Sequence, residues 1–248
     1  MLLAVDIGNS NIHSGIFEES FLKKDFKIPT YTDDLGVEYR KKLRPYIRSI
    51  DKVILVSVVP KISIDVKRVL RSTLGIRILV VGENIDSGVK NCYNKPKQVG
   101  QDRLVNARAG FDLYGGESII VDFGTAITID MVNRKKEYLG GLIVPGLELS
   151  LNALSGRAAL LPKIILSKPR SLLGKETKDS MISGAVYGIS SLCDGVVNKL
   201  KNKYSKDAKA IATGGVAEFI SPYCKSIEKV DRALTLKGLQ LISEEKDV

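Results

Sequence analysis

The chain opens on an apolar run that ends in a polar turn, and the same pattern returns near its middle. The first run ends in Asp6-Ile7-Gly8-Asn9-Ser10-Asn11, and the second ends in Val121-Asp122-Phe123-Gly124-Thr125-Ala126. After each turn, apolar and polar residues alternate with a period of two, which predicts strands at 12–17, 21–28, 127–132 and 137–144. The pattern therefore predicts a three-strand meander at the start of each half.

Beyond each meander, apolar residues recur at helical spacing and alternate with short apolar runs. The first half is expected to form helices at 33–50, 60–74 and 102–114, with strands at 53–56 and 76–81. The second half is expected to form helices at 147–159, 177–204 and 231–243, with a strand at 208–213. This order indicates an α/β fold in which helices cover mixed sheets.

The repeated pattern predicts a duplicated fold with two domains, residues 1–115 and 116–248. An alternative is that the two Asp-x-Gly turns are a coincidence, because strand-to-turn junctions favour these residue types. Two such turns, each opening a similar run of strands, favour duplication.

Several classes of protein are excluded by what the sequence lacks. His13 is the only histidine and the three cysteines lie far apart, so neither a zinc site nor a disulfide framework is expected. The glycine spacings of a P-loop and of a dinucleotide fingerprint are missing. The opening apolar run stops at Asp6, which is typical of a buried strand and not of a signal peptide or membrane span. Each cysteine is expected to be a buried, small apolar residue in a reducing compartment.

The net charge of +10 comes from 38 basic and 28 acidic residues and favours acidic partners such as nucleotides, carboxylates or nucleic acid. The basic residues are spread along helical stretches such as 40–44 and 199–203, without the interleaved aromatic side chains of a single-strand groove. A solvated lysine-rich face is therefore preferred to a nucleic-acid surface.

The two polar turns have the composition of phosphate-binding sites. Glycine followed by short polar residues lets a strand turn tightly, so that backbone N–H groups face outward and can bind an anion. Asp6 and Asp122 each stand two residues before the glycine and would bind a cation that bridges the phosphates. His13 lies at the edge of the first turn and is interpreted as filler unless its backbone also reaches the phosphates.

A third glycine pair, Gly214-Gly215, follows a predicted strand and opens a helix. It would let a ribose or a flat ring approach the backbone closely. A plain strand-to-helix turn is the alternative. Beside two phosphate turns, nucleoside contact is the preferred interpretation.

Four motifs occur in a fixed order along the chain: Asp6 to Asn11, Gly100-Gln101-Asp102-Arg103-Leu104-Val105-Asn106-Ala107, Val121 to Ala126, and Gly140-Gly141-Leu142-Ile143-Val144-Pro145-Gly146. Together they resemble the type III pantothenate kinases, members of the actin, heat-shock ATPase and sugar-kinase superfamily. The resemblance extends from residue 1 to about residue 242.

The resemblance implies two ribonuclease-H-like domains with ATP in the cleft between them, as in actin-like ATPases. It implies ATP-dependent phosphorylation of pantothenate to 4′-phosphopantothenate, the first step of coenzyme A biosynthesis. It also implies a cytoplasmic homodimer that requires Mg²⁺ and a monovalent cation, K⁺ or NH₄⁺, and that has no membrane partner.

The site residues are carried over by position. Asp102 is similar to the family's proton acceptor, and Asp122 is similar to the ligand of the monovalent cation, with Asp6 as a possible Mg²⁺ ligand. The ATP-binding positions are Asp6, Ile7, Gly8, Asn9, Ser10, Asn11, Ile12, His13 and Thr125. The pantothenate-binding positions are Tyr93, Gly100, Gln101, Asp102, Arg103 and Thr177.

Three positions depart from the family's usual pattern, and two residues have simpler interpretations. Ser10 replaces a threonine, Gln101 stands where a small residue is common, and Ile127 removes a hydroxyl from the second turn. Asp102 could merely cap the helix that it opens, and Arg103 could simply form an ion pair with it.

Two other functions are weighed against the kinase. One is a nucleotide-binding regulatory accessory protein that binds DNA or a protein, although no helix-turn-helix signature is present. The other is a kinase for another small hydroxyl metabolite, because a fold does not fix its substrate.

Overall fold

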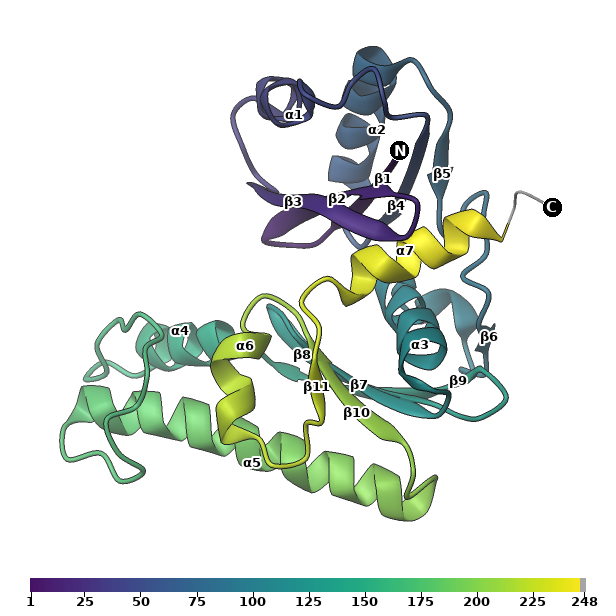
Figure 1. Ribbon diagram of the computed structural model, residues 1–248. Helices are drawn as coiled ribbons and strands as arrows, with labels where there is room; N and C mark the ends of the chain where they lie inside the picture. Colours follow the sequence, from purple (N-terminus) through teal and green to yellow (C-terminus); the bar gives the residue numbers. More distant parts are fainter. Residues whose placement is uncertain (246–248) are drawn as a thin grey trace. The chain divides into compact units, whose positions relative to one another are not determined.

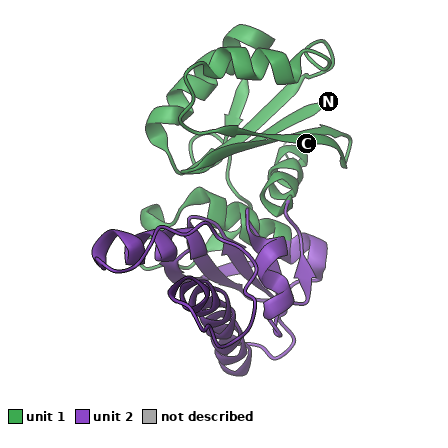
Figure 2. Cartoon of the chain, turned by 90° about the vertical axis from the view of Figure 1, so that its left-hand side faces the viewer, with its two compact units in different colours: residues 1–109, 233–248 green, residues 110–232 purple. Residues whose placement is uncertain are grey.

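The structure is a computed structural model in which residues 1–245 are described. The chain forms two compact units, drawn in different colours in Figure 2. Unit 1 comprises Met1–Ala109 together with the segment from Ala233, and unit 2 comprises Gly110–Arg232. The expected division at 115/116 differs from this one chiefly in the C-terminal segment, which belongs to unit 1.

Unit 1 contains a five-stranded sheet with the strand order β3-β2-β1-β4-β5. Strands β1, β2 and β3 pair antiparallel, whereas β1, β4 and β5 are parallel. The five strands of this sheet are β1 (Leu2–Ile7), β2 (Asn11–Glu18), β3 (Phe21–Pro29), β4 (Lys52–Ser57) and β5 (Ile78–Val80). The short strand β6 (Lys90–Asn91) also lies among the residues of unit 1 but is not part of this sheet. Its helices are α1 (Leu35–Leu43), α2 (Pro60–Leu74), the 3₁₀ helix η1 (Pro96–Gln98), α3 (Gln101–Tyr114, which continues into unit 2) and α7 (Leu234–Glu244).

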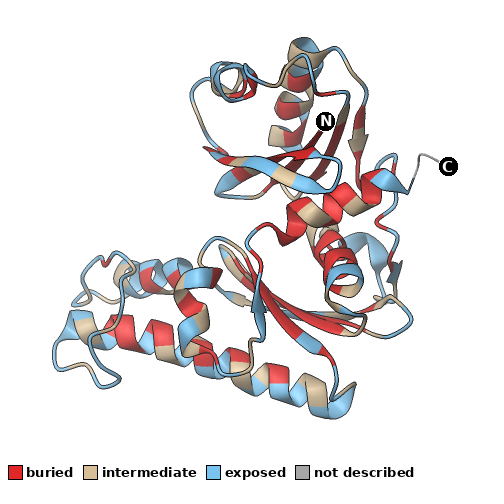
Figure 3. Ribbon diagram, viewed as in Figure 1, coloured by how far each residue is buried: buried red, intermediate tan, exposed pale blue. Residues whose placement is uncertain are grey.

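Both faces of the unit 1 sheet are buried, as the fully apolar start of the chain requires. Along β1, Leu3 and Val5 pack with the core that α1 and α2 cover, whereas Leu2 and Ala4 point to the opposite face. On that face they pack with leucines of α7, such as Leu236. Figure 1 shows α7 beside this sheet, and Figure 3 shows that much of α7 is buried. Because α7 covers the second face of this sheet, it belongs to unit 1 despite its place at the end of the sequence.

Unit 2 repeats the topology of unit 1. The five strands formed by unit 2's own residues lie in the order β9-β8-β7-β10-β11 within the second sheet, with an antiparallel meander β7-β8-β9 and the parallel strand β10 beside β7. The strands are β7 (Ser118–Phe123), β8 (Ala126–Val132), β9 (Glu137–Pro145), β10 (Lys209–Thr213) and β11 (Lys229–Val230). The helices are α4 (Leu147–Arg157), α5 (Thr177–Lys203), α6 (Ala217–Ile220) and the 3₁₀ helix η2 (Ser221–Tyr223). The order matches unit 1 strand for strand, so the predicted duplication is confirmed.

Helix α5 supplies much of the unit 2 core. Val186, Cys193 and Val197 lie fully buried with the apolar residues of β7 and β8. Within the described residues, α5 is the single helix long and apolar enough to cross a membrane, but core helices of globular proteins satisfy the same test. Its packing against the sheet is that of a core helix.

Two local expectations are wrong. The helix expected at 33–50 ends at Leu43, because Pro45 lacks the N–H that would continue the helix, and the chain then proceeds in turns. All three cysteines were expected to be buried, and Cys193 and Cys224 are, but Cys92 is exposed. It lies in the connection between β6 and η1, which the hydrophobic pattern left unassigned.

Asp194 of α5 holds the segment that leads to β11 through hydrogen bonds. Its carboxylate accepts hydrogen bonds from the backbone N–H groups of Lys225 (2.9 Å) and Ser226 (2.8 Å) and from the Ser226 hydroxyl (2.7 Å). Burial alone would raise the pKa of Asp194, but these hydrogen bonds and the charge of Lys225 outweigh it and hold the pKa below its ordinary value.

Substitution Asp194→Ala is expected to lower the free energy of unfolding by about 2 kcal/mol, because charge-assisted hydrogen bonds are lost at a partly buried site. Since the folded pKa is depressed, the contribution of Asp194 is present above the unfolded pKa and is lost as the pH falls through the folded pKa. Urea unfolding at neutral pH and at about pH 3 measures this effect. The matched control Asp207→Ala removes an exposed aspartate and should change stability little; equal losses for both variants would contradict the assignment.

Candidate active site

The turn after β1 exposes three short polar side chains at the carboxyl edge of the parallel strands. Gly8 N–H donates to the Asn11 carbonyl (3.1 Å) and closes the turn. Asn9, Ser10 and Asn11 are all exposed there. Thr30, which follows β3, donates its hydroxyl to the Gly8 carbonyl (2.7 Å), so the turn is fixed from a second strand. An exposed, rigid turn of this kind can bind an anion.

The other predicted ATP-binding residues of unit 1 lie in the strands beside this turn. Ile7 and Ile12 pair across the hairpin and are fully buried, so they shape the turn from below. His13 lies within β2 and pairs with Asp6 on one side and Lys27 on the other. Because its backbone belongs to the sheet, His13 is a strand residue and not a member of the turn.

The imidazole of His13 has a defined partner. Its Nε2 lies 2.8 Å from a carboxylate oxygen of Asp25 on β3. Both side chains are largely shielded from solvent. The interpretation of His13 as filler therefore misses a polar contact that joins β2 to β3.

The start of α3 lies at the same edge of unit 1. Val58, which follows β4, donates its N–H to the Ile7 carbonyl (3.1 Å), directly before the Gly8 turn. A Cβ on Gly100 would lie 3.6 Å from Cγ1 of Val58. Asp102 follows in the first turn of α3, where the N-terminal end of the helix favours a carboxylate. The Gly8 turn and Asp102, the predicted base, thus belong to one edge of one unit.

Asp102 and its neighbours are well defined locally. The Asp102 carboxylate accepts the N–H of Arg103 (2.9 Å), so part of its hydrogen bonding does serve the helix start. Arg103 is buried, with 6% of its surface exposed. Tyr93 is half-buried in the connection before η1, where its N–H donates to the Asn91 side chain (3.0 Å).

Unit 2 carries the second turn, which is one residue shorter, because Phe123 pairs with Ile127 whereas Ile7 pairs with Ile12. Gly124 N–H donates to the Ala126 carbonyl (3.2 Å), and Gly146 N–H donates to the Thr125 carbonyl (3.0 Å). Thr125 is exposed. Ile127 is fully buried in the core, so the hydroxyl missing at this position is replaced by core packing.

The glycine pair after β10 lies beside this second turn. Asp122 and Thr213 are register partners at the carboxyl ends of the parallel strands β7 and β10. A Cβ on Gly214 would overlap the Asp122 carboxylate and would lie 2.7 Å from backbone atoms of Phe123, whereas a Cβ on Gly215 would meet open space. Gly214 is thus needed for packing, and Gly215 leaves room for a ligand.

Asp6 and Asp122 could each supply one carboxylate ligand to a cation, but neither belongs to a larger cluster of metal-binding side chains among the described residues. Among residues 1–245 there is no group of three or more histidine, cysteine, aspartate or glutamate side chains that could hold a metal ion. A cation at Asp122 or Asp6 would therefore take its remaining ligands from phosphate oxygens, backbone carbonyls and water, as Mg²⁺ does in phosphoryl-transfer sites.

Thr177 lies in a different surrounding, at the first turn of α5. It lines a groove of about 810 Å³ between α4, α5 and the chain segment before α5. The other lining residues are mostly apolar or small, including Leu154, Met181, Gly184, Gly188 and Leu192. This groove could not be predicted from the sequence, because its walls come from three separate segments.

Comparison with solved structures identifies the class of fold. The chain is similar to a ROK hexokinase from Thermus thermophilus (TM-score 0.53, 16% identity, covering 100% of this chain and 99% of that one). It is also similar to a Baf family protein from Campylobacter jejuni (TM-score 0.63, 21% identity, covering 99% and 98%). The duplicated sheets with polar glycine turns are those of the actin-like ATPase and sugar-kinase fold, as predicted.

Sequence comparison then gives the family. The family model for type III pantothenate kinase matches residues 2–199. Type III pantothenate kinases from Geobacter sulfurreducens and Halalkalibacterium halodurans are 42% and 39% identical to the chain, each covering 98% of it and 98% of the relative. The chain therefore belongs to the type III pantothenate kinase family.

Proposed function

We propose that this protein transfers the γ-phosphoryl group of ATP to pantothenate, giving 4′-phosphopantothenate at the start of coenzyme A biosynthesis. The observation that supports this most strongly is the edge of unit 1, where three segments lie side by side: the Gly8–Asn11 turn, Val58 and the Gly100–Asp102 segment. An anion-binding turn and a carboxylate at one strand edge are what phosphoryl transfer to an alcohol requires.

Each residue has a defined task in this reaction. The acceptor hydroxyl attacks the γ-phosphorus, the bond between that phosphorus and the β–γ bridging oxygen breaks, and the hydroxyl proton passes to the Asp102 carboxylate. The Gly8–Asn11 turn and Thr125 hold the phosphates, and Gly214-Gly215 accommodates the nucleoside. Gly100, Gln101, Arg103, Tyr93 and Thr177 bind pantothenate, with Arg103 offering a cation to its carboxylate or to phosphate.

The cations of the reaction are assigned to the two strand-end aspartates. Asp122 would hold the monovalent cation, K⁺ or NH₄⁺, and Asp6 is the candidate contact for Mg²⁺. When bound, Mg²⁺ neutralises phosphate charge that develops during transfer. The crowding of Asp122 against Gly214 supports its assignment, because it fixes the carboxylate at the end of β7.

The proposed reaction is tested by coupled ADP release over a panel of small hydroxyl-bearing acids and sugars, with and without K⁺. Release that depends on pantothenate and is stimulated by K⁺ is expected. ADP release with another acceptor and none with pantothenate would show that pantothenate is not the substrate. ADP release at the same rate with and without K⁺ would contradict the assignment of Asp122 to a monovalent cation.

The enzyme is further proposed to act as a cytoplasmic homodimer that needs neither a membrane nor nucleic acid. The groove on unit 2 supports self-association. Gly184 and Gly188 lie one helical turn apart on α5, and a Cβ on either would meet open space. Exposed apolar side chains surround them, including Leu154 (46% exposed) and Leu192 (39%). An apolar face of this kind, with two small residues at helical spacing, suits close contact with another helix.

Substitution Gly188→Leu is expected to convert the dimer to a monomer, because the new side chain occupies the contact surface. Analytical ultracentrifugation measures the change in oligomeric state. The fold should survive, since no atom lies within 4 Å of the new Cβ. Gly195→Leu is the matched control, because Gly195 is also on α5 with open space around it but does not line the groove. A monomeric wild type, or equal effects of both substitutions, would contradict the proposed dimer surface.

A further inference from the structure

The side chain of Gln101 lies directly over Gly82 in unit 1. A Cβ on Gly82 would come within 2.6 Å of Cδ, 2.8 Å of Cγ and 2.9 Å of Oε1 of Gln101. Gly82 also has a φ of +84°, which favours glycine. Residue 82 can therefore carry no side chain while Gln101 keeps its conformation.

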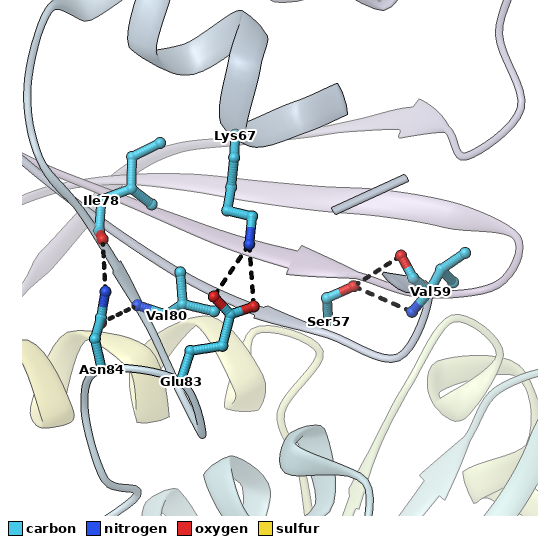
Figure 4. Close-up of polar contacts among 7 residues, drawn as sticks. All are labelled: Ser57, Val59, Lys67, Ile78, Val80, Glu83 and Asn84. Carbon is cyan, nitrogen blue, oxygen red and sulfur yellow. Dashed lines mark hydrogen bonds and ion pairs between the residues drawn. The ribbon is translucent and has the colours of Figure 1, made fainter. Parts of the chain in front are cut away.

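The loop that contains Gly82 is held rigidly after β5. Gly82 N–H donates to the Ile85 carbonyl (2.9 Å). The Asn84 side chain accepts the Val80 N–H (2.8 Å) and donates to the Ile78 carbonyl (3.2 Å), as Figure 4 shows. A rigid loop can fix the side chain that packs on it.

An ion pair also joins the loop after β5 to α2. Lys67 donates to both carboxylate oxygens of Glu83 (3.0 and 3.1 Å) (Figure 4). In the same view, the Ser57 hydroxyl bonds the backbone of Val59 and shapes the neighbouring loop after β4. Both loops therefore lie at the carboxyl edge of the parallel strands with fixed conformations.

Gln101 stands directly before Asp102 and brings a carboxamide with two donor hydrogens and one acceptor oxygen to this edge. We propose that the loop Val80–Ile85 is a positioning element that acts through Gln101. Packing on Gly82 fixes the carboxamide where it can hydrogen-bond the acceptor substrate and orient its hydroxyl toward Asp102. This inference rests on the proposed function, since the acceptor is pantothenate.

The first test is the variant Gly82→Ala, which forces Gln101 to move. The KM for pantothenate is expected to rise about tenfold, the effect of one lost neutral hydrogen bond, while the KM for ATP stays within about twofold. Gly75→Ala is the matched control: Gly75 has a similar φ of +71°, but a Cβ there meets nothing within 4 Å. It carries the same backbone strain and should leave both KM values unchanged.

The second test is the double variant Gly82→Ala/Gln101→Ala. If Gly82 acts through Gln101, the pantothenate KM of the double variant equals that of Gln101→Ala alone. Should Gly82→Ala fail to fold because of the overlap, the double variant is expected to fold. Additive KM effects, equal rises in both substrates' KM values, or a double variant that still does not fold would overturn the proposal. If the proposed function itself is wrong, the wild-type protein will show no pantothenate-dependent ADP release, and this outcome is distinct from those above.

Discussion

Substitution Asp102→Asn is expected to lower kcat by about 10²- to 10⁴-fold while the dissociation constant for ATP stays within about twofold. Asparagine has the same shape as aspartate, and its side-chain oxygen can still accept the N–H of Arg103, so the helix start is preserved. It cannot take a proton from the acceptor hydroxyl. Steady-state ADP release and equilibrium titration with a fluorescent ATP analogue measure the two quantities.

The control for this prediction is another acid in the first turn of a helix. Glu38 of α1 occupies such a place at a distance in sequence from the site, and Glu38→Gln changes the same helix-end electrostatics. It should leave kcat unchanged. If Asp102 only capped its helix, both variants would lose a little stability and neither would lose turnover, and the assignment of the base would fall.

Substitution Gly214→Ala is expected to destabilise the protein by about 2–5 kcal/mol, the sum of a positive φ and a forced overlap. Gly214 has a φ of +96°, and the new Cβ would lie 2.7 Å from backbone atoms of Phe123 and overlap the Asp122 carboxylate. The overlap pushes Asp122 out of place, so any protein that folds should also need more K⁺ for half-maximal activity. Chemical unfolding and K⁺ titration of activity measure these effects.

Gly215→Ala is the internal control, because its Cβ enters open space and its backbone conformation is ordinary. Its stability is expected to stay within about 0.5 kcal/mol of the wild type, as for a substitution without new contacts. Similar losses in the two variants would show that the glycine pair serves the turn alone and that Asp122 is not held by Gly214.

The order of elements could be predicted because, in both halves, alternating apolar and polar residues indicate the strands and Asp-x-Gly indicates the turns. The strand orders β3-β2-β1-β4-β5 and β9-β8-β7-β10-β11 follow from a meander joined to parallel strands. The place of α7 could not be predicted, because its apolar face suits either sheet. Only the packing of Leu236 and Leu239 on the second face of the unit 1 sheet decides it.

Local parts of the site were predictable, but contacts between segments distant in sequence were not. Asp102 and the Gly8 turn are separated by more than ninety residues. They share an edge because the parallel pairing of β1 and β4 places Val58 beside Ile7, and Gly100 packs near Val58. Thr30 donates a hydrogen bond that holds the first turn, and Gln101 packs on Gly82, yet neither Thr30 nor Gly82 belongs to a motif. Such contacts depend on which loops end at the same sheet edge, and hydrophobic periodicity carries no information about that.

The central claim is that the unit 1 edge directs the γ-phosphoryl group of ATP to the hydroxyl of pantothenate through Asp102. A single-turnover experiment with γ-labelled ATP and pantothenate tests it directly, with the products separated by chromatography. Label in 4′-phosphopantothenate with wild-type protein, and almost none with Asp102→Asn that still binds ATP, is the predicted result. Label that appears only in inorganic phosphate, or transfer that continues at the wild-type rate without the Asp102 carboxylate, would contradict it.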